Sequence, residues 1–183
     1  MKLFTKTTLT LFAFLMVTQM VSAQKVNSGA WMIGGTIGFN SITTDGDDNA
    51  ETYLNVSPSL GYFFMNDLAI GARMSLTTYS YDGDSNSEFG FGPWARYYIV
   101  GSPLFAQAGM DFGTAGFDFF SLFTDEGSTT LNLGVGYSWF LNNAVAIEPM
   151  VQYNIYSAAD DGVFSDYSRF GFNIGVQAFL GRN

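Results

Sequence analysis

The chain has 183 residues, no cysteine and no histidine, and a formal net charge of −9. The absence of cysteine excludes disulfides, and the absence of histidine excludes histidine-dependent hydrolases and histidine-ligated zinc. The acidic balance disfavours nucleic acid as a partner, because nucleic-acid binding needs basic patches. Aromatic residues make up 17% of the chain and charged residues only 13%, whereas soluble domains contain about 25% charged residues.

The first 23 residues have the three-part layout of a secretory signal peptide. Lys2 and Lys6 make a basic start, an almost entirely apolar run follows, and small residues precede a cut at Gln24. An uncleaved anchor helix is the alternative, but the apolar run is shorter than the ~20 residues that a membrane span needs. We therefore expect a cleaved signal peptide over 1–23 and one domain over 24–183, with five basic and 16 acidic residues and a net charge of −11.

From residue 30 onward, apolar side chains alternate with small or polar ones at a period of two. A β-strand places successive side chains on opposite faces, so each such segment has one apolar face. Glycines within most of the segments disfavour a helix. The eight segments are 31–39, 54–64, 68–77, 89–99, 104–113, 131–139, 145–155 and 170–178, each near the ~9–11 residues of a tilted membrane strand.

The connections between these segments alternate in length. The short ones are 65–67, 101–103 and 141–143, and the longer ones are 41–51, 82–87, 114–128 and 157–168. Outer-membrane barrels have short periplasmic turns and longer outside loops, and 13 of the 16 acidic residues lie in or beside the longer connections. Aromatic residues lie near both ends of the apolar faces, as in the two interfacial girdles of such barrels: Trp31, Tyr62, Phe64, Tyr97, Tyr137 and Trp139 toward the turns, and Phe39, Phe89, Phe112, Tyr153 and Phe170 toward the loops.

The polarity of the two faces separates a membrane barrel from a soluble one. The apolar face carries aromatic rings on nearly every strand, whereas the other face is largely Gly, Ser, Thr and Asn with a few ionisable groups. A soluble barrel would crowd the rings into one small lumen, while a membrane barrel places them in lipid. The sequence therefore predicts an all-β fold, an eight-stranded antiparallel up-and-down transmembrane β-barrel, in a bacterial outer membrane.

Short motifs carry a family resemblance. Residues 58–63 (PSLGYF) with 68–71 (LAIG), then 92–98 (GPWARYY) and 147–149 (IEP), resemble the outer-membrane protein β-barrel domain family of small porin-like proteins, in the style of Bacteroidetes-type bacteria. The resemblance covers about residues 24–183 and implies an eight-stranded barrel in the outer membrane, usually without an assigned biochemical activity. The chain departs from barrels of this class by continuing past Phe179, whereas they usually end on the aromatic residue.

Three prolines, Pro58, Pro93 and Pro149, lie inside the expected strands. Proline removes one hydrogen-bond donor from a strand ladder. We therefore expect β-bulges at these positions.

Four ionisable residues share the inward face, namely Arg73, Arg96, Asp111 and Glu148. A charge inside a lumen needs a partner, because isolated burial is costly. We expect an ion-pair network in the lumen, with Glu148 paired to Arg73 or Arg96. We interpret it as a plug that holds the barrel shut, and a gate is the alternative interpretation.

Two of the longer connections resemble calcium-binding loops in part. Residues 45–48 are acidic, and residues 82–88 begin with the spacing D-x-D-x-N but have Ser87 and Pro93 where a calcium loop has glycine and glutamate. We interpret both as solvated acidic loops, and divalent ions bridging them to lipopolysaccharide phosphates are a weaker hypothesis. We interpret an apolar cluster in the third long connection as a strand extension or a loop over the barrel mouth. A docking site for a hydrophobic ligand or partner is the alternative. The cluster consists of Phe117, Phe119, Phe120, Leu122 and Phe123.

These features predict an envelope structural or surface-interaction protein with a mostly plugged lumen. A porin-like passage for small hydrophobic molecules is the alternative function. We expect no enzymatic activity, no cofactor and no metal site. The expected partners are outer-membrane lipid, lipopolysaccharide, the barrel-assembly machinery and an extracellular partner held through the loops.

Overall fold

A computed structural model of the chain describes residues 26–43, 50–81, 84–99, 102–115, 128–158 and 167–182. In these ranges no helix is long and apolar enough to span a membrane. The expected signal peptide lies outside them. The strands are β1 (Trp31–Thr43), β2 (Ala50–Met65), β3 (Leu68–Tyr81), β4 (Asp84–Tyr98), β5 (Leu104–Ala115), β6 (Ser128–Tyr137), β7 (Trp139–Phe140), β8 (Val145–Ala158) and β9 (Tyr167–Leu180).

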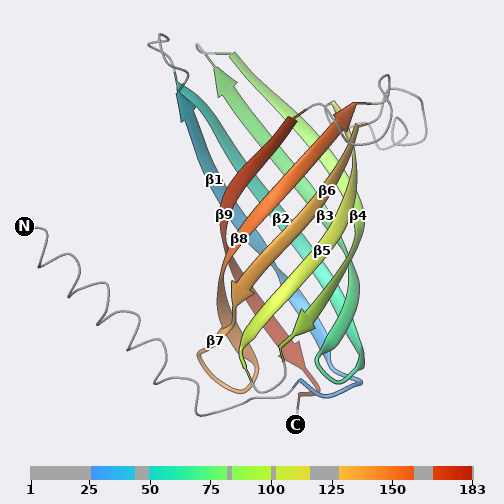
Figure 1. The fold of residues 1–183 in the computed structure, drawn as a ribbon. Helices are drawn as coiled ribbons and strands as arrows, with labels where there is room; N and C mark the ends of the chain where they lie inside the picture. The colour runs from blue at the N-terminus through green and yellow to red at the C-terminus, as the bar shows by residue number, and fades with distance from the viewer. Residues whose placement is uncertain are drawn as a thin grey trace, which may run out of the picture.

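The strands form one closed antiparallel sheet (Figure 1). Each strand pairs with its neighbours in the chain, and the pairing of β1 with β9 closes the barrel. β6 and β7 are two parts of one strand, because both pair with β8 in a single register, Gly136 opposite Met150 and Trp139 opposite Ile147. The predicted eight-stranded antiparallel up-and-down barrel is therefore confirmed.

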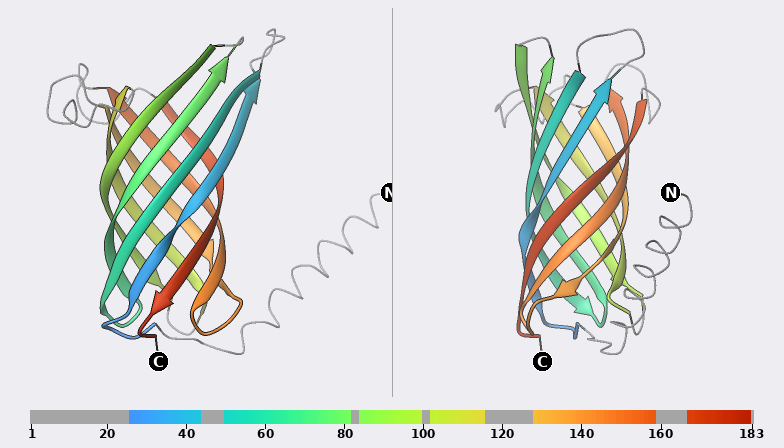
Figure 2. Two further views of the ribbon diagram at one scale, coloured as in Figure 1. Left: turned by 180° about the vertical axis from the view of Figure 1, so that it is seen from behind. Right: turned by 90° about the vertical axis from the view of Figure 1, so that its left-hand side faces the viewer.

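The two ends of the barrel differ. The short connections, Asn66–Asp67 among them, lie at one end, where β9 finishes beside the start of β1 (Trp31 opposite Leu180). We call this the turn end and the opposite one the loop end. At the loop end, the β1–β2 and β3–β4 hairpins project beyond the other strands (Figure 2).

The main strands are longer than the segments that the alternation marked, at 10 to 16 residues. Pairing of β3 with β4 continues as far as Tyr81 opposite Asp84, which leaves only residues 82 and 83 between the strands. The longer connection expected over 82–87 is therefore wrong. The hydrogen-bond ladder needs no apolar face, so it continues past the apolar segment toward an Asp-Gly pair, a strong signal for a two-residue hairpin turn.

The expected bulges at the three prolines are also wrong. Each proline keeps a partner on one side, as Pro149 does opposite Ile174. On the other side the pairing breaks and then resumes in the same register. An antiparallel residue directs its N–H to one neighbour only, so a missing N–H interrupts one ladder and leaves the other intact. The break between β6 and β7 faces Pro149 and Glu148 for this reason. The register shift in the β2–β3 pair lies between Phe63 and Met65, beside a turn.

The outer face of the barrel is apolar and exposed. Ile37 is 58% exposed, Val135 64% and Phe170 69%. Four charged side chains of the strands point into the lumen instead, and at most 8% of each is exposed: Arg73, Arg96, Asp111 and Glu148. Among the residues of the two expected aromatic girdles, those exposed on the outer face are Trp31, Tyr62, Phe64, Tyr97 and Trp139 near the turn end and Phe39, Phe112 and Phe170 nearer the loop end.

Candidate functional site

The lumen is filled by apolar side chains at the turn end. Phe63, Phe105 and Phe179 point inward and are buried. The sequence did not predict these rings, because the inward face was expected to be small and polar. The available signal was the alternation itself: each ring directly follows or precedes a residue assigned to the outer face, namely Tyr62, Leu104 and Ala178. We call the whole buried cluster the turn-end plug: Val26, Ala30, Met32, Phe63, Ala69, Trp94, Tyr98, Phe105, Ala146, Met150 and Phe179.

The rings of the plug contact one another, both on adjacent strands and past an intervening strand. The ring centroids of Tyr98 and Phe105 lie 5.6 Å apart, and those of Phe63 and Phe179 lie 6.2 Å apart. Such tilted pairs stabilise a core beyond the area that they bury. The plug therefore joins strands from all sides of the lumen.

Inward-facing glycines make room for the largest rings. A Cβ atom at Gly136 would lie 2.4 Å from Cζ of Phe105, and one at Gly61 would lie 2.4 Å from Cη2 of Trp94. Neither contact is sterically tolerable. The small residues of the inward face are thus the complement of the rings, and the plug needs both.

Arg96 and Glu148 form a buried ion pair within the plug. Nη1 of Arg96 lies 2.6 Å from Oε2 of Glu148, and the hydroxyls of Tyr98 and Ser138 both donate to Oε1 of the same carboxylate. Nε of Arg96 donates to Gln107 at 2.9 Å. The guanidinium also lies 3.9 Å from the centroid of the Phe105 ring, a cation–π contact.

Arg73 and Asp111 form a second pair, nearer the loop end. Nε and Nη2 of Arg73 donate to the two oxygens of Asp111 at 2.8 and 2.9 Å, and Asn132 donates to Asp111 at 3.0 Å. The four ionisable residues singled out in the sequence thus lie in the lumen as two pairs. Glu148 contacts Arg96 and not Arg73.

Residues 26–30, which we call the N-terminal strap, close the turn end. Val26 and Ala30 are fully buried. The amide of Val26 donates to Oδ1 of Asp67 at 3.3 Å, and the amide of Asp67 donates back to the carbonyl of Val26 at 3.0 Å. Two backbone hydrogen bonds join the strap to β2. The amide of Gly29 donates to the carbonyl of Phe63, and the amide of Phe63 donates to the carbonyl of Ala30.

The turn end is completed by the last residues described. The Arg182 guanidinium lies 3.8 Å from the centroid of the Phe140 ring, and Phe140 packs against Phe179. Partial burial lowers the pKa of Arg182 from its ordinary value.

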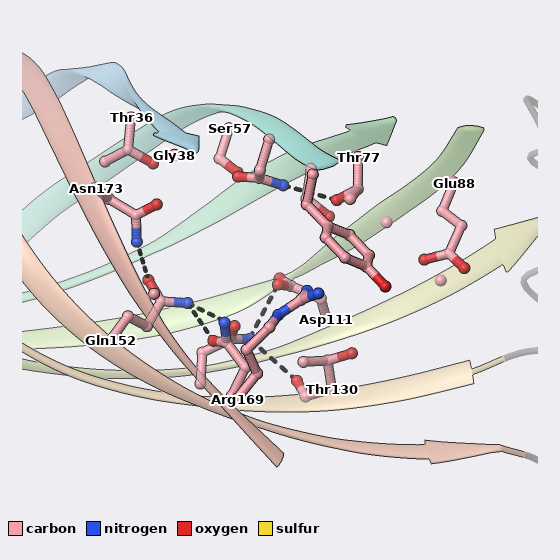
Figure 3. Close-up of a pocket in the computed structure, with 18 of the residues that line it drawn as sticks. Thr36, Gly38, Ser57, Thr77, Glu88, Asp111, Thr130, Gln152, Arg169 and Asn173 are labelled. Atoms are coloured by element: carbon pink, nitrogen blue, oxygen red, sulfur yellow. Dashed lines mark hydrogen bonds between the residues drawn. The ribbon is translucent and has the colours of Figure 1, made fainter. Parts of the chain in front are cut away.

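Above the Arg73–Asp111 pair, the loop end holds a polar cavity of about 100 Å³ (Figure 3). Amide and hydroxyl side chains on its wall bond to one another: Asn55 with Thr77, and Gln152 with Asn132, Asn154 and Asn173. Glu88, Arg169, Tyr53 and Tyr156 also line it. We call this space the loop-end cup.

Other candidate residues from the sequence lie outside the described ranges. Phe117, Phe119, Phe120 and Phe123 are among them, as is the acidic run 45–48. Residues 84–88, expected in a loop, lie in β4. Within the part of the chain that the structure covers, no group of three acidic residues could hold a metal ion.

No protein-family model and no curated protein matches the chain, so the resemblance to the outer-membrane β-barrel domain family stays a prediction. Solved structures do match. Neisserial surface protein A is 16% identical with a TM-score of 0.56, over 82% of this chain and 97% of that one. The outer membrane protein OprG of Pseudomonas aeruginosa is 12% identical with a TM-score of 0.49, over 86% and 98%. The outer membrane protein AlkL is 11% identical with a TM-score of 0.42, over 85% and 90%. The likeness to Neisserial surface protein A shows that this chain shares the fold of a small outer-membrane barrel.

Proposed function

We propose that this chain is an outer-membrane barrel with a closed lumen, a structural or surface-interaction protein of the cell envelope rather than an enzyme. The observation that carries the proposal is the turn-end plug. Rings from several strands, a buried ion pair and the N-terminal strap fill the same cross-section of the lumen.

The outer face supports a place in the membrane. Water would meet a continuous band of large apolar side chains on this face, which soluble monomers rarely expose. In a bilayer the same band faces acyl chains, and each strand pairs with its neighbours in the closed sheet. Outer-membrane lipid and lipopolysaccharide are then the surroundings of the barrel, and the barrel-assembly machinery is the route by which it inserts.

The buried ion pair favours a plug over a gate. Opening the lumen would separate Arg96 from Glu148 and remove two further donors from that carboxylate. Separating one partner of a buried pair costs about 3–5 kcal/mol. With the plug in place, the parts of the molecule left to meet other molecules are the loop end and its connections.

Recording from planar bilayers tests the closed lumen. We expect the refolded wild-type protein to give no steady conductance, because the plug fills the lumen at the turn end. A Phe105→Ala/Phe179→Ala variant, which removes two plug rings, is the matched comparison and should show transient current. Steady conductance of the wild type at neutral pH would contradict the proposal.

A second candidate function is a passage for small hydrophobic molecules. The observation that favours it is an apolar groove on the outer wall, where Ala95, Ala106 and Ala108 lie between larger neighbours such as Tyr97 and Tyr153. Liposomes that contain the protein would take up a small hydrocarbon faster than empty ones under this second function. Equal uptake by liposomes with and without the protein would contradict this second function and leave the structural or surface-interaction role.

A further inference from the structure

The loop-end cup lies in the lumen at the loop end and is closed below. Its floor is the Arg73–Asp111 pair, in which each charge meets its opposite directly. Below the floor lies the turn-end plug. A molecule that enters the cup from the loop end therefore meets a blind cavity of about 100 Å³, large enough for a few waters or one small solute.

Arg169 brings a positive charge to this cavity without a contact counter-ion. Its guanidinium carbon lies 4.1 Å from the centroid of the Tyr53 ring and 5.2 Å from that of Tyr156, and Nη2 donates to the Tyr156 hydroxyl at 2.6 Å. Among the described residues, no carboxylate oxygen lies within 4.0 Å of it. Two rings and a hydroxyl thus fix the side chain, and no described carboxylate compensates its charge by contact.

The guanidinium of Arg169 is also short of acceptors. Its Nε is buried and has no hydrogen-bond partner in the part of the chain that the structure describes. A buried donor without an acceptor costs free energy, and a charged donor costs more. A carboxylate that settles beside this guanidinium would relieve that cost with charge-assisted hydrogen bonds.

Glu88 supplies the opposite charge on another wall of the cup. Its carboxylate has no hydrogen-bond or ion-pair partner among the described residues, and it lines the same cavity as Arg169. Figure 3 shows Glu88 apart from the hydrogen-bonded side chains of Asp111 and Gln152. Two opposite charges therefore line one small cavity without touching.

We propose that the loop-end cup binds a small zwitterion, a molecule that carries a carboxylate and an ammonium group a few bonds apart. The carboxylate would lie beside Arg169 and the ammonium beside Glu88. A free amino acid with a small side chain is the simplest molecule of this class. A simple anion or a simple cation would satisfy only one of the two charges.

This inference goes beyond the proposed function. Because the cavity is blind, it implies capture at the loop end and not passage across the barrel. Binding in the cup and conductance through the barrel are separate measurements, so one proposal can fail while the other stands.

Binding of four small probes to the refolded protein in detergent micelles tests the inference. Glycine and L-alanine carry both charges, whereas acetate and methylammonium carry one each. Isothermal titration or saturation-transfer NMR reads out the affinity, and heat-modifiable migration in gels confirms that each variant is folded. We expect saturable binding of glycine and alanine, and affinities at least about tenfold lower for acetate and methylammonium.

Two variants and one control place the site. Glu88→Gln and Arg169→Gln should each weaken glycine binding at least about tenfold, because each removes one charge-assisted contact. Arg182→Gln removes an arginine at the opposite end and should leave glycine binding unchanged. Three outcomes would overturn the inference: no saturable binding of glycine, binding of acetate as tight as that of glycine, or glycine binding that Glu88→Gln leaves unchanged.

Discussion

Glu148 is the single side chain that holds most of the polar part of the plug together. Its carboxylate accepts from Arg96, Tyr98 and Ser138, which come from β4 and from the junction of β6 and β7. All four side chains are buried. In such surroundings a carboxylate and a guanidinium each depend on the other for their charge to be tolerated.

Replacing Glu148 with Gln should therefore destabilise the barrel strongly. The change keeps the shape of the side chain but leaves Arg96 buried without a counter-charge, at a cost of about 3–5 kcal/mol. Urea titration in lipid vesicles, followed by the gel shift between folded and unfolded protein, measures the loss.

Glu88→Gln is the matched control for this substitution. Glu88 has no ion-pair contact among the described residues, so its replacement should change stability by less than about 0.5 kcal/mol. Equal stabilities of the two variants would show that the Arg96–Glu148 pair does not stabilise the plug.

The N-terminal strap is the element whose contacts least resemble those of a barrel strand. It docks on the β2–β3 turn, where Asp67 has a φ of 64°, in the left-handed region. Asp67 also accepts from the amide of Tyr98 through its carbonyl, at 2.8 Å. One turn residue thus connects the strap, the β2–β3 hairpin and the end of β4.

Asp67→Ala should loosen the strap. Alanine in the left-handed region costs about 1–2 kcal/mol, and the side-chain bond from the amide of Val26 is lost as well. We expect a lower urea midpoint and faster proteolytic removal of the residues before β1. Asp67→Asn is the control, because asparagine tolerates this backbone conformation and keeps an acceptor oxygen. Equal proteolysis of the alanine and asparagine variants would argue against a strap held by Asp67.

At the scale of the whole molecule, period-two alternation was enough to predict the barrel. It placed Ile37 outward and Arg73 inward, and the structure agrees. Strand lengths were underestimated, because the alternation in hydropathy fades where strands leave the apolar zone while backbone pairing continues, as in β3 and β4. The alternation therefore predicts which face of the sheet a side chain lies on, but not how far the backbone pairing of a strand extends.

The contents of the lumen were harder to predict. Parity identified the four ionisable residues but could not separate Arg96 from Arg73 as the partner of Glu148, because that choice depends on the stagger of strands around the closed sheet. The inward rings Phe63, Phe105 and Phe179 were not predicted, because glycines on the same inward face made that face look small. In the folded barrel such glycines lie against rings from other strands.

The proposed place in a bilayer makes a prediction that a soluble barrel of the same fold does not. Ile174 lies near the middle of β9, is 50% exposed on the outer face and faces Ile37 and Pro149 on the adjoining strands. In water, arginine at such an exposed site would change stability by less than about 0.5 kcal/mol. In the middle of a bilayer it should cost about 2–4 kcal/mol, because the charge displaces acyl chains and stays poorly hydrated.

Ala144→Arg, in an exposed turn at the turn end, is the control and should be neutral in both settings. Unfolding in vesicles compares the two variants directly, and an Ile174→Arg protein as stable as Ala144→Arg would contradict a membrane-embedded outer face, since only lipid around Ile174 makes these positions differ.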